Sequence, residues 1–291
     1  KDFSKIFLEF DSISVYELLN FWPKEFKETV YDWMLSNSKG KISNFSINFN
    51  LFDSNGNFNF NNLNGKFDFQ DTKIRYMESM PWVVDIDGNA IIQENKILFL
   101  ISSGISNDLS IQNGKVILYD LDTDFEQSNV NLTINSKNKH VVNYLKKSPI
   151  NVKNYKKLEN IEGNTKIKLE LDFPLIIDLP TEKITYGSEV NIKNAIFKGI
   201  FKDYNIDDFI VDISIDSEGV SYSGSGALIN SIVTFEGKQF SENNKLIDTV
   251  SGIYNLNSKY LETILPKNSL EYTGDININF EIKEDDDGIA K

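Results

Sequence analysis

Strict alternation of apolar and polar residues, repeated along most of the chain, is the feature that most constrains its fold. Apolar side chains recur at every second position in segments around residues 45–51, 58–60, 67–69, 130–134, 167–173, 209–215 and 276–282. A period of two sends successive side chains to opposite faces of a strand, so each segment has one apolar and one polar face. This pattern is typical of antiparallel sheets with one face in water.

Turn-forming residues separate these segments. The signals are Ser54-Asn55-Gly56, Asp87-Gly88, Gln112-Asn113-Gly114, Glu218-Gly219 and Glu236-Gly237. Their spacing predicts about fifteen strands. The chain has only 16 Gly and 6 Pro in 291 residues. Asn and Asp tolerate left-handed backbone, so we expect these abundant residues to replace glycine in turns.

Helices are predicted to be few and short, over residues 15–36, 141–147 and 258–265, with Ser14 as the first N-cap. The polar segment 148–164 is the best candidate for a joint. Residues 65–118 and 187–238 show a similar order of Gly, strands and an acidic-Gly pair, which indicates two copies of one β-unit. The predicted organisation is therefore a helical start plus first β-unit at 1–147, the joint at 148–164, and a second β-unit at 165–291.

Composition removes most familiar chemistry. Lys and Arg number 30 against 43 Asp and Glu, a formal charge of −13, which disfavours nucleic-acid binding. With no Cys and one His, His140, we expect no disulfide, thiolate or metal site and no cofactor. Carboxylates for glycoside hydrolysis exist at Asp120, Asp122, Asp124, Asp207 and Asp208, but such acids are ordinary on so acidic a chain. An enzyme is the less favoured alternative.

The amount of apolar surface is more informative than any motif. The chain holds 21 Phe and 12 Tyr, many of the Phe on the apolar side of alternating strands, and no apolar run long enough to span a membrane. An apolar sheet face must be covered by a second sheet, by helices, by curling of the sheet or by a ligand. The predicted helices are too few. A sandwich, a barrel and an open trough for a lipid-like ligand all remain compatible with the residues.

Several motifs, taken in order, resemble the AsmA-like proteins of the YhdP type from Gram-negative bacteria. They are Phe21-Trp22-Pro23 with Trp33 and Gly40-Lys-Ile; Ile74-Arg-Tyr76 with Met80-Pro-Trp and Val84-Asp-Ile-Asp-Gly88; Ile111-Gln-Asn-Gly114-Lys-Val; Lys147-Ser-Pro-Ile150; Ile161-Glu-Gly163 with Leu169-Glu-Leu-Asp-Phe-Pro174; and Tyr222-x-Gly-x-Gly with Val233-x-Phe-x-Gly237. Each motif is loose, and their order and spacing carry the resemblance over essentially the whole chain.

The resemblance implies an all-β, elongated, twisted antiparallel sheet curled into an open groove, with a few short helices. It implies a non-enzymatic, periplasmic segment of a lipid-conducting groove, anchored to the inner membrane elsewhere, that takes part in phospholipid transport between the inner and outer membranes. Phospholipid acyl chains are the expected partners. A ligand-free β-sandwich scaffold is the alternative. The alternation assigns these groove positions: Phe45, Ile47, Phe49, Leu51, Phe67, Phe69, Ile167, Leu169, Leu171, Phe209, Val211, Ile213, Ile215, Ile276, Ile278 and Phe280.

Overall fold

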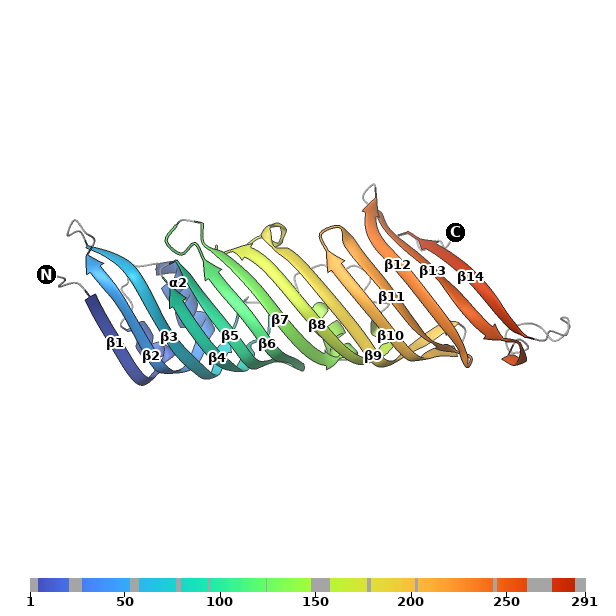
Figure 1. The fold of residues 1–291 in the computed structure, drawn as a ribbon, viewed down its shortest axis with the longest axis horizontal. Coiled ribbons are helices and arrows are strands. Elements are labelled where there is room, and N and C mark those ends of the chain that lie inside the picture. Colours follow the sequence, from blue (N-terminus) through green and yellow to red (C-terminus); the bar gives the residue numbers. More distant parts are fainter. Residues whose placement is uncertain are drawn as a thin grey trace. The chain divides into compact units, whose positions relative to one another are not determined.

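The computed structural model describes residues 5–20, 28–52, 58–76, 80–93, 95–123, 125–147, 158–176, 179–201, 204–242, 245–260 and 274–285. Strands dominate these residues and form an open sheet in which fourteen strands follow one another in chain order (Figure 1). The predicted all-β, antiparallel class with few helices is confirmed. The strands are β1 (Lys5–Ser14), β2 (Ser38–Phe52), β3 (Phe58–Ile74), β4 (Val83–Gln93), β5 (Lys96–Ser106), β6 (Leu109–Tyr119), β7 (Gln127–Lys137), β8 (Ile161–Pro174), β9 (Thr185–Phe201), β10 (Tyr204–Asp216), β11 (Gly219–Leu228), β12 (Ser231–Glu242), β13 (Lys245–Asn257) and β14 (Asp275–Glu284).

The chain divides into two compact units. Unit 1 comprises Lys1–Asn135, Lys147–Asn151 and Leu169–Thr185, and unit 2 comprises Ser136–Lys146, Val152–Lys168 and Tyr186–Lys291. Within each unit, the strand ladders are antiparallel and join strands that are consecutive in the chain. The joint predicted at 148–164 is described only from residue 158 onward, and β8 already begins at Ile161. The predicted domain boundaries stay a prediction.

Helices are short, as expected. They are α1 (Val15–Leu19), α2 (Glu28–Asn37), α3 (Asn138–Leu145) and two 3₁₀ turns, η1 (Thr181–Lys183) and η2 (Ser258–Tyr260). Ser14 caps α1 as predicted: its Oγ accepts from the Glu17 amide at 3.1 Å, and the Glu17 carboxylate accepts from the Ser14 amide at 3.0 Å. This reciprocal pair satisfies two donors that a helix start leaves open. The third helix begins three residues before its predicted start, and the predicted segment 261–265 lies outside the described residues.

Asn residues adopt left-handed backbone in turns, as predicted and as Asn107 and Asn230 do, and Asn and Asp also occupy bulges inside the strands. Asn44, Asp71 and Asp85 in β2 to β4, and Asn194 and Asp208 in β9 and β10, have φ of 50° or 51°. The ladders shift register beside these positions. A bulge inserts one extra residue, so apolar residues three apart in sequence share a face. The bulges therefore keep the apolar face continuous where strict alternation breaks.

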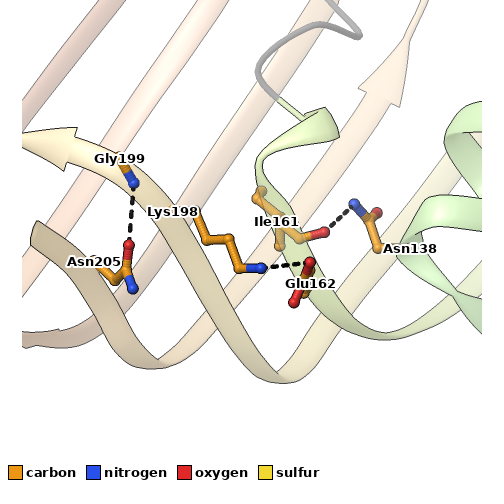
Figure 2. A network of polar contacts seen from close by, with 6 residues as sticks. All are labelled: Asn138, Ile161, Glu162, Lys198, Gly199 and Asn205. Carbon is orange, nitrogen blue, oxygen red and sulfur yellow. Dashed lines mark hydrogen bonds and ion pairs between the residues drawn. The ribbon is translucent and has the colours of Figure 1, made fainter. Parts of the chain in front are cut away.

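A polar network ties α3 to the start of β8 and the end of β9 in unit 2 (Figure 2). The Asn138 side chain is 1% exposed, and its Nδ2 donates to the carbonyls of Leu158 and Ile161 at 2.7 and 2.9 Å. Lys198 Nζ lies 2.6 Å from Glu162 Oε1, which links β9 to β8. These bonds anchor the helix and Leu158, and Leu158 packs against the apolar core of unit 2.

Three predicted turns are wrong. Gly88, Gly114 and Gly237 lie inside β4, β6 and β12 rather than between strands. Each faces a large side chain on the neighbouring strand: a Cβ on Gly88 would lie 2.6 Å from Phe69 Cζ, and one on Gly237 would lie 2.4 Å from Tyr222 Cζ. These glycines make room for side chains within the ladder. The turn at Glu218-Gly219 is confirmed, and Ser54 to Gly56 lie outside the described residues.

Candidate apolar binding surface

The apolar side chains of unit 1 gather on one face of the sheet. Phe10, Phe45 and Phe67 follow one another across β1, β2 and β3 with ring centres 5.7 and 6.2 Å apart. Phe67 then meets Phe69 and Phe99, each at 6.2 Å. Ring pairs at these separations and tilts are attractive beyond the area they bury. An aromatic band thus crosses the first strands of this unit on a single face.

Direct register partners extend this face into a row, which we call the unit 1 row. Residues directly opposite in a ladder point to the same face, so partners in successive ladders align across the sheet. Every member of the row is apolar or glycine, and it crosses seven strands. The row consists of Ile13, Ile42, Phe69, Gly88, Ile101, Gly114 and Leu132.

Unit 2 has a corresponding row, the unit 2 row, which crosses six strands: Val190, Ile213, Tyr222, Gly237, Val250 and Ile282. A parallel row lies two residues away along the strands: Ile192, Val211, Gly224, Phe235, Gly252 and Phe280. At about 4.8 Å per strand, six strands span about 24 Å. That exceeds the length of one acyl chain, which is about half of the ~30 Å hydrocarbon core of a bilayer.

Burial is uneven over the apolar face of unit 2. Ile192, Phe209 and Leu256 are 1%, 2% and 0% exposed and belong to a packed core. Members of the unit 2 row are only half-buried, and Ile282 is 39% exposed. The face therefore has a part closed by protein and a part that is accessible within the described residues.

One polar contact interrupts the apolar character near the unit 2 row. The Tyr222 hydroxyl donates to Asp248 Oδ1 at 2.6 Å, and Asp248 is 5% exposed. Burial, together with the neighbouring Asp248 and Glu284 charges, raises the pKa of Tyr222 far above its ordinary value. The hydroxyl therefore stays protonated and donates to the carboxylate. The pair satisfies both groups, which would otherwise be costly at the border of an apolar surface.

A hollow of about 900 Å³ in unit 2 is lined mostly by residues of the polar face, together with five members of the unit 2 row: Val190, Ile213, Tyr222, Gly237 and Val250. Its walls include Lys166, Asp212, Glu236 and Ser251, all of which alternate with residues of the apolar face. A twisted sheet is saddle-shaped and can be hollow on either face along different diagonals. With lysines and carboxylates in its walls, this hollow does not suit an apolar ligand.

Fifteen of the sixteen groove positions assigned from sequence have described side chains, and they divide by burial. Phe45, Phe49, Phe69, Phe209 and Val211 are buried, while Ile278 is 40% exposed. The half-buried members are Ile47, Phe67, Ile167, Leu169, Leu171, Ile213, Ile215, Ile276 and Phe280. Leu51 lies in β2, but its side chain is outside the described part. Their role in lipid binding stays a prediction.

Sequence reasoning missed several row members. Ile13 lies at a strand end and Ile42 beside the Asn44 bulge, Tyr222 sits in a segment rich in Ser and Gly, and Leu132 belongs to the alternating segment 130–134 but was not assigned to the groove. The signal that identifies them is register: each lies opposite an apolar or glycine partner.

The candidate carboxylates lie at turns and bulges. Asp120 has φ of 57° just beyond β6, and Asp208 is the bulge residue of β10, so both positions have a structural explanation. Asp122 lies in the turn after Asp120, Asp207 is exposed beside Asp208, and Asp124 is outside the described residues. Over the described ranges, no group of three His, Asp or Glu is placed to hold a metal ion.

The fold and these faces define a class: an all-β protein of antiparallel strands in an open sheet, in which each unit has an apolar face that no second sheet covers among the described residues. A sandwich of two sheets is therefore not the fold of these residues. The chain belongs to the YhdP family, because its sequence matches the family described as YhdP protein over residues 4–286. No curated protein and no solved structure matches the chain. None of the described helices has the length and hydrophobicity needed to cross a bilayer.

Proposed function

We propose that this chain is a non-enzymatic segment of a surface that conducts phospholipids, with acyl chains lying on its apolar face. The observation that carries the proposal is the presence of unbroken apolar rows across seven strands in unit 1 and six in unit 2. Register aligns apolar residues in this way in any sheet with one apolar face, but here no second sheet covers the rows among the described residues. Such alignment provides a track on which a linear hydrocarbon keeps apolar contact over its length.

The mechanism is passive. Each methylene removed from water contributes about 0.8 kcal/mol, so a chain that is only half covered is still held. When it shifts by one strand it leaves one apolar residue and meets another, and the free energy changes little. Glycines beneath the rings, as at Gly88 and Gly237, let the aromatic side chains lie close to the sheet. The apolar surface therefore has no tall protruding side chains at these positions, and the lipid headgroup stays in water.

Family membership supports a place for this segment in the periplasm, in transport between the inner and outer membranes. An inner-membrane anchor outside this segment is part of the same proposal. The most direct test places a photo-crosslinking residue at Ile213, in the unit 2 row, and at Ile47. Asp212 and Asn48, the adjacent residues on the polar face, are matched controls. We expect phospholipid crosslinks from Ile213 and Ile47 and none from the controls.

A second control uses burial. Phe209 is 2% exposed on the same face, so a crosslinker there should capture protein and not lipid. Phe209→Asp should unfold unit 2, because an unpaired charge is buried, whereas Ile213→Asp should leave the fold intact and reduce bound lipid. Unfolding of Ile213→Asp, with no lipid crosslink at Ile213 or Ile47, would instead support a scaffold without a ligand.

A further inference from the structure

Three cations and one tryptophan meet where β2 begins, β3 ends and β4 begins, in unit 1. Lys39 and Lys73 are direct register partners across the β2–β3 ladder. Arg75 follows β3, and Trp82 immediately precedes β4. Like charges placed directly opposite each other destabilise a sheet. Lys39 and Lys73 are exposed, so water and salt screen part of their repulsion, and a bound anion would reduce it further.

The tryptophan gathers two of the cations. Lys39 Nζ lies 5.5 Å and Arg75 Cζ 5.4 Å from the centre of the Trp82 ring. Asn37 fixes the arginine from a third side: its carbonyl accepts from the Arg75 amide at 2.9 Å, and its Oδ1 accepts from Arg75 Nε at 3.2 Å. The guanidinium is thus oriented through Nε, which leaves its two terminal nitrogens for another acceptor.

No carboxylate among the described residues forms an ion pair with Lys39, Lys73 or Arg75. Some lysines elsewhere in the described part form ion pairs, as Lys146 does with Glu159 at 2.8 Å and Lys198 with Glu162 at 2.6 Å, and Lys39 and Lys73 are among those that do not. The acids nearest to the three cations along their strands, Asp71 and Asp85, are bulge residues. The cations at this end of the sheet therefore contact the Trp82 ring and the Asn37 amide, and no carboxylate of the described residues neutralises them.

The same strand ends reach the apolar face. Ile74, between Lys73 and Arg75, is the register partner of Val83, next to Trp82. Both pack against the apolar cluster that contains Phe69, a member of the unit 1 row. Consecutive residues of a strand point to opposite faces, so the cations and the apolar surface are separated only by the thickness of the sheet edge.

We propose that Lys39 and Arg75, which lie over Trp82, and Lys73, the register partner of Lys39, bind the phosphate of a phospholipid headgroup at the strand ends that border the apolar face. The inference rests on the proposed function, because it takes the acyl chains to lie on that face. A phosphodiester carries one negative charge and oxygens that match the forked donors of arginine, while the lysines act as point charges. An anion here also relieves the Lys39–Lys73 repulsion. Inorganic phosphate shares this chemistry and is the alternative source.

The test compares two lipids with identical acyl chains, phosphatidylglycerol and diacylglycerol, bound in competition to the purified chain and read by native mass spectrometry. The triple variant Lys39→Gln, Lys73→Gln and Arg75→Gln removes the proposed site. A matched control, Lys146→Gln, Lys168→Gln and Lys198→Gln, removes three positive charges from ion pairs in unit 2. Far-ultraviolet circular dichroism verifies that both variants are folded.

We expect the wild type to prefer phosphatidylglycerol, the triple variant to lose that preference by about tenfold or more, and the control to keep it. Arg75→Lys should fall between, because it retains the charge without the fork. Equal preference in wild type and triple variant overturns the phosphate site while leaving the lipid face standing. Binding of neither lipid to the wild type overturns both proposals. If inorganic phosphate binds the wild type but not the triple variant, and the wild type shows no preference between the two lipids, the headgroup assignment is overturned.

Discussion

Two glycines on the apolar face of unit 1 allow a matched test of how tightly its rings are packed. A Cβ on Gly88 in β4 would lie 2.2 Å from the Leu100 carbonyl oxygen and 2.6 Å from Phe69 Cζ. A Cβ on Gly104 in β5 would meet Ile111 Cδ1 at 3.5 Å, an ordinary contact. The first change forces ring and backbone apart, whereas the second fills available space.

Overpacking of this kind costs about 1–3 kcal/mol, so Gly88→Ala should destabilise the protein by at least that amount. Gly104→Ala should be neutral or stabilising by about 0.4–1 kcal/mol, because it restricts the unfolded chain at a position where alanine fits. The expected difference is about 1–4 kcal/mol. Since each kcal/mol shifts the Tm of a domain of this size class by about 2–4 °C, the two melting temperatures should differ by several degrees or more.

The assay is urea and thermal unfolding followed by far-ultraviolet circular dichroism on both variants and the wild type. If Gly88→Ala unfolds at the same urea concentration as Gly104→Ala, the ring of Phe69 does not lie over Gly88 as described. The argument that glycines hold the aromatic track close to the sheet would then be refuted.

Other contacts make further predictions. Asn138→Ala leaves the two buried carbonyls without their hydrogen-bond donor and should lower the free energy of unfolding in urea by about 1–3 kcal/mol. An unchanged free energy of unfolding would mean that water reaches these carbonyls. Ser14→Ala should lower the free energy of unfolding by about 0.5–2 kcal/mol, because the helix loses its N-cap. Hydrogen bonds from Ser14 lower the pKa of Glu17, so the stability that the Glu17 carboxylate contributes is present at neutral pH and lost as pH falls. Unfolding of Glu17→Gln and wild type at pH 7 and pH 3 tests this direction. The raised Tyr222 pKa means the folded state loses stability above pH 10, the ordinary value, and Tyr222→Phe should lack that loss.

Local pattern predicted the class of fold because alternation is a property of single strands. Phe209, Val211 and Ile213 were assigned to one face from sequence spacing, and they lie on one face. Glycine was misread for the same reason: Gly88 beside Asp87 has the local signature of a turn, and only the ring of Phe69 on the next strand explains its place within β4. Prediction from local sequence cannot detect a constraint that comes from a residue on a neighbouring strand.

The uneven burial of the apolar face could not be predicted either. Ile192 and Val190 are equivalent by alternation, yet the first is 1% exposed and the second half-buried. Burial depends on which residues other segments cover. The cation cluster illustrates the same limit: Lys39 is far in sequence from Lys73 and Trp82, and the strand register brings Lys39 and Lys73 together.

The pairing of each strand with its chain neighbours has a consequence for how the protein is made. Since ladders within each unit close between consecutive strands, hairpins can form as soon as their residues are available, and none must wait for a distant partner. The danger in such a sheet is slippage, because a shift of one residue would turn every ring toward water. Asn44, Asp71 and Asp85 form bulges on neighbouring strands, and each bulge is compatible with one strand register only. A hairpin that pairs in a shifted register cannot accommodate its bulge.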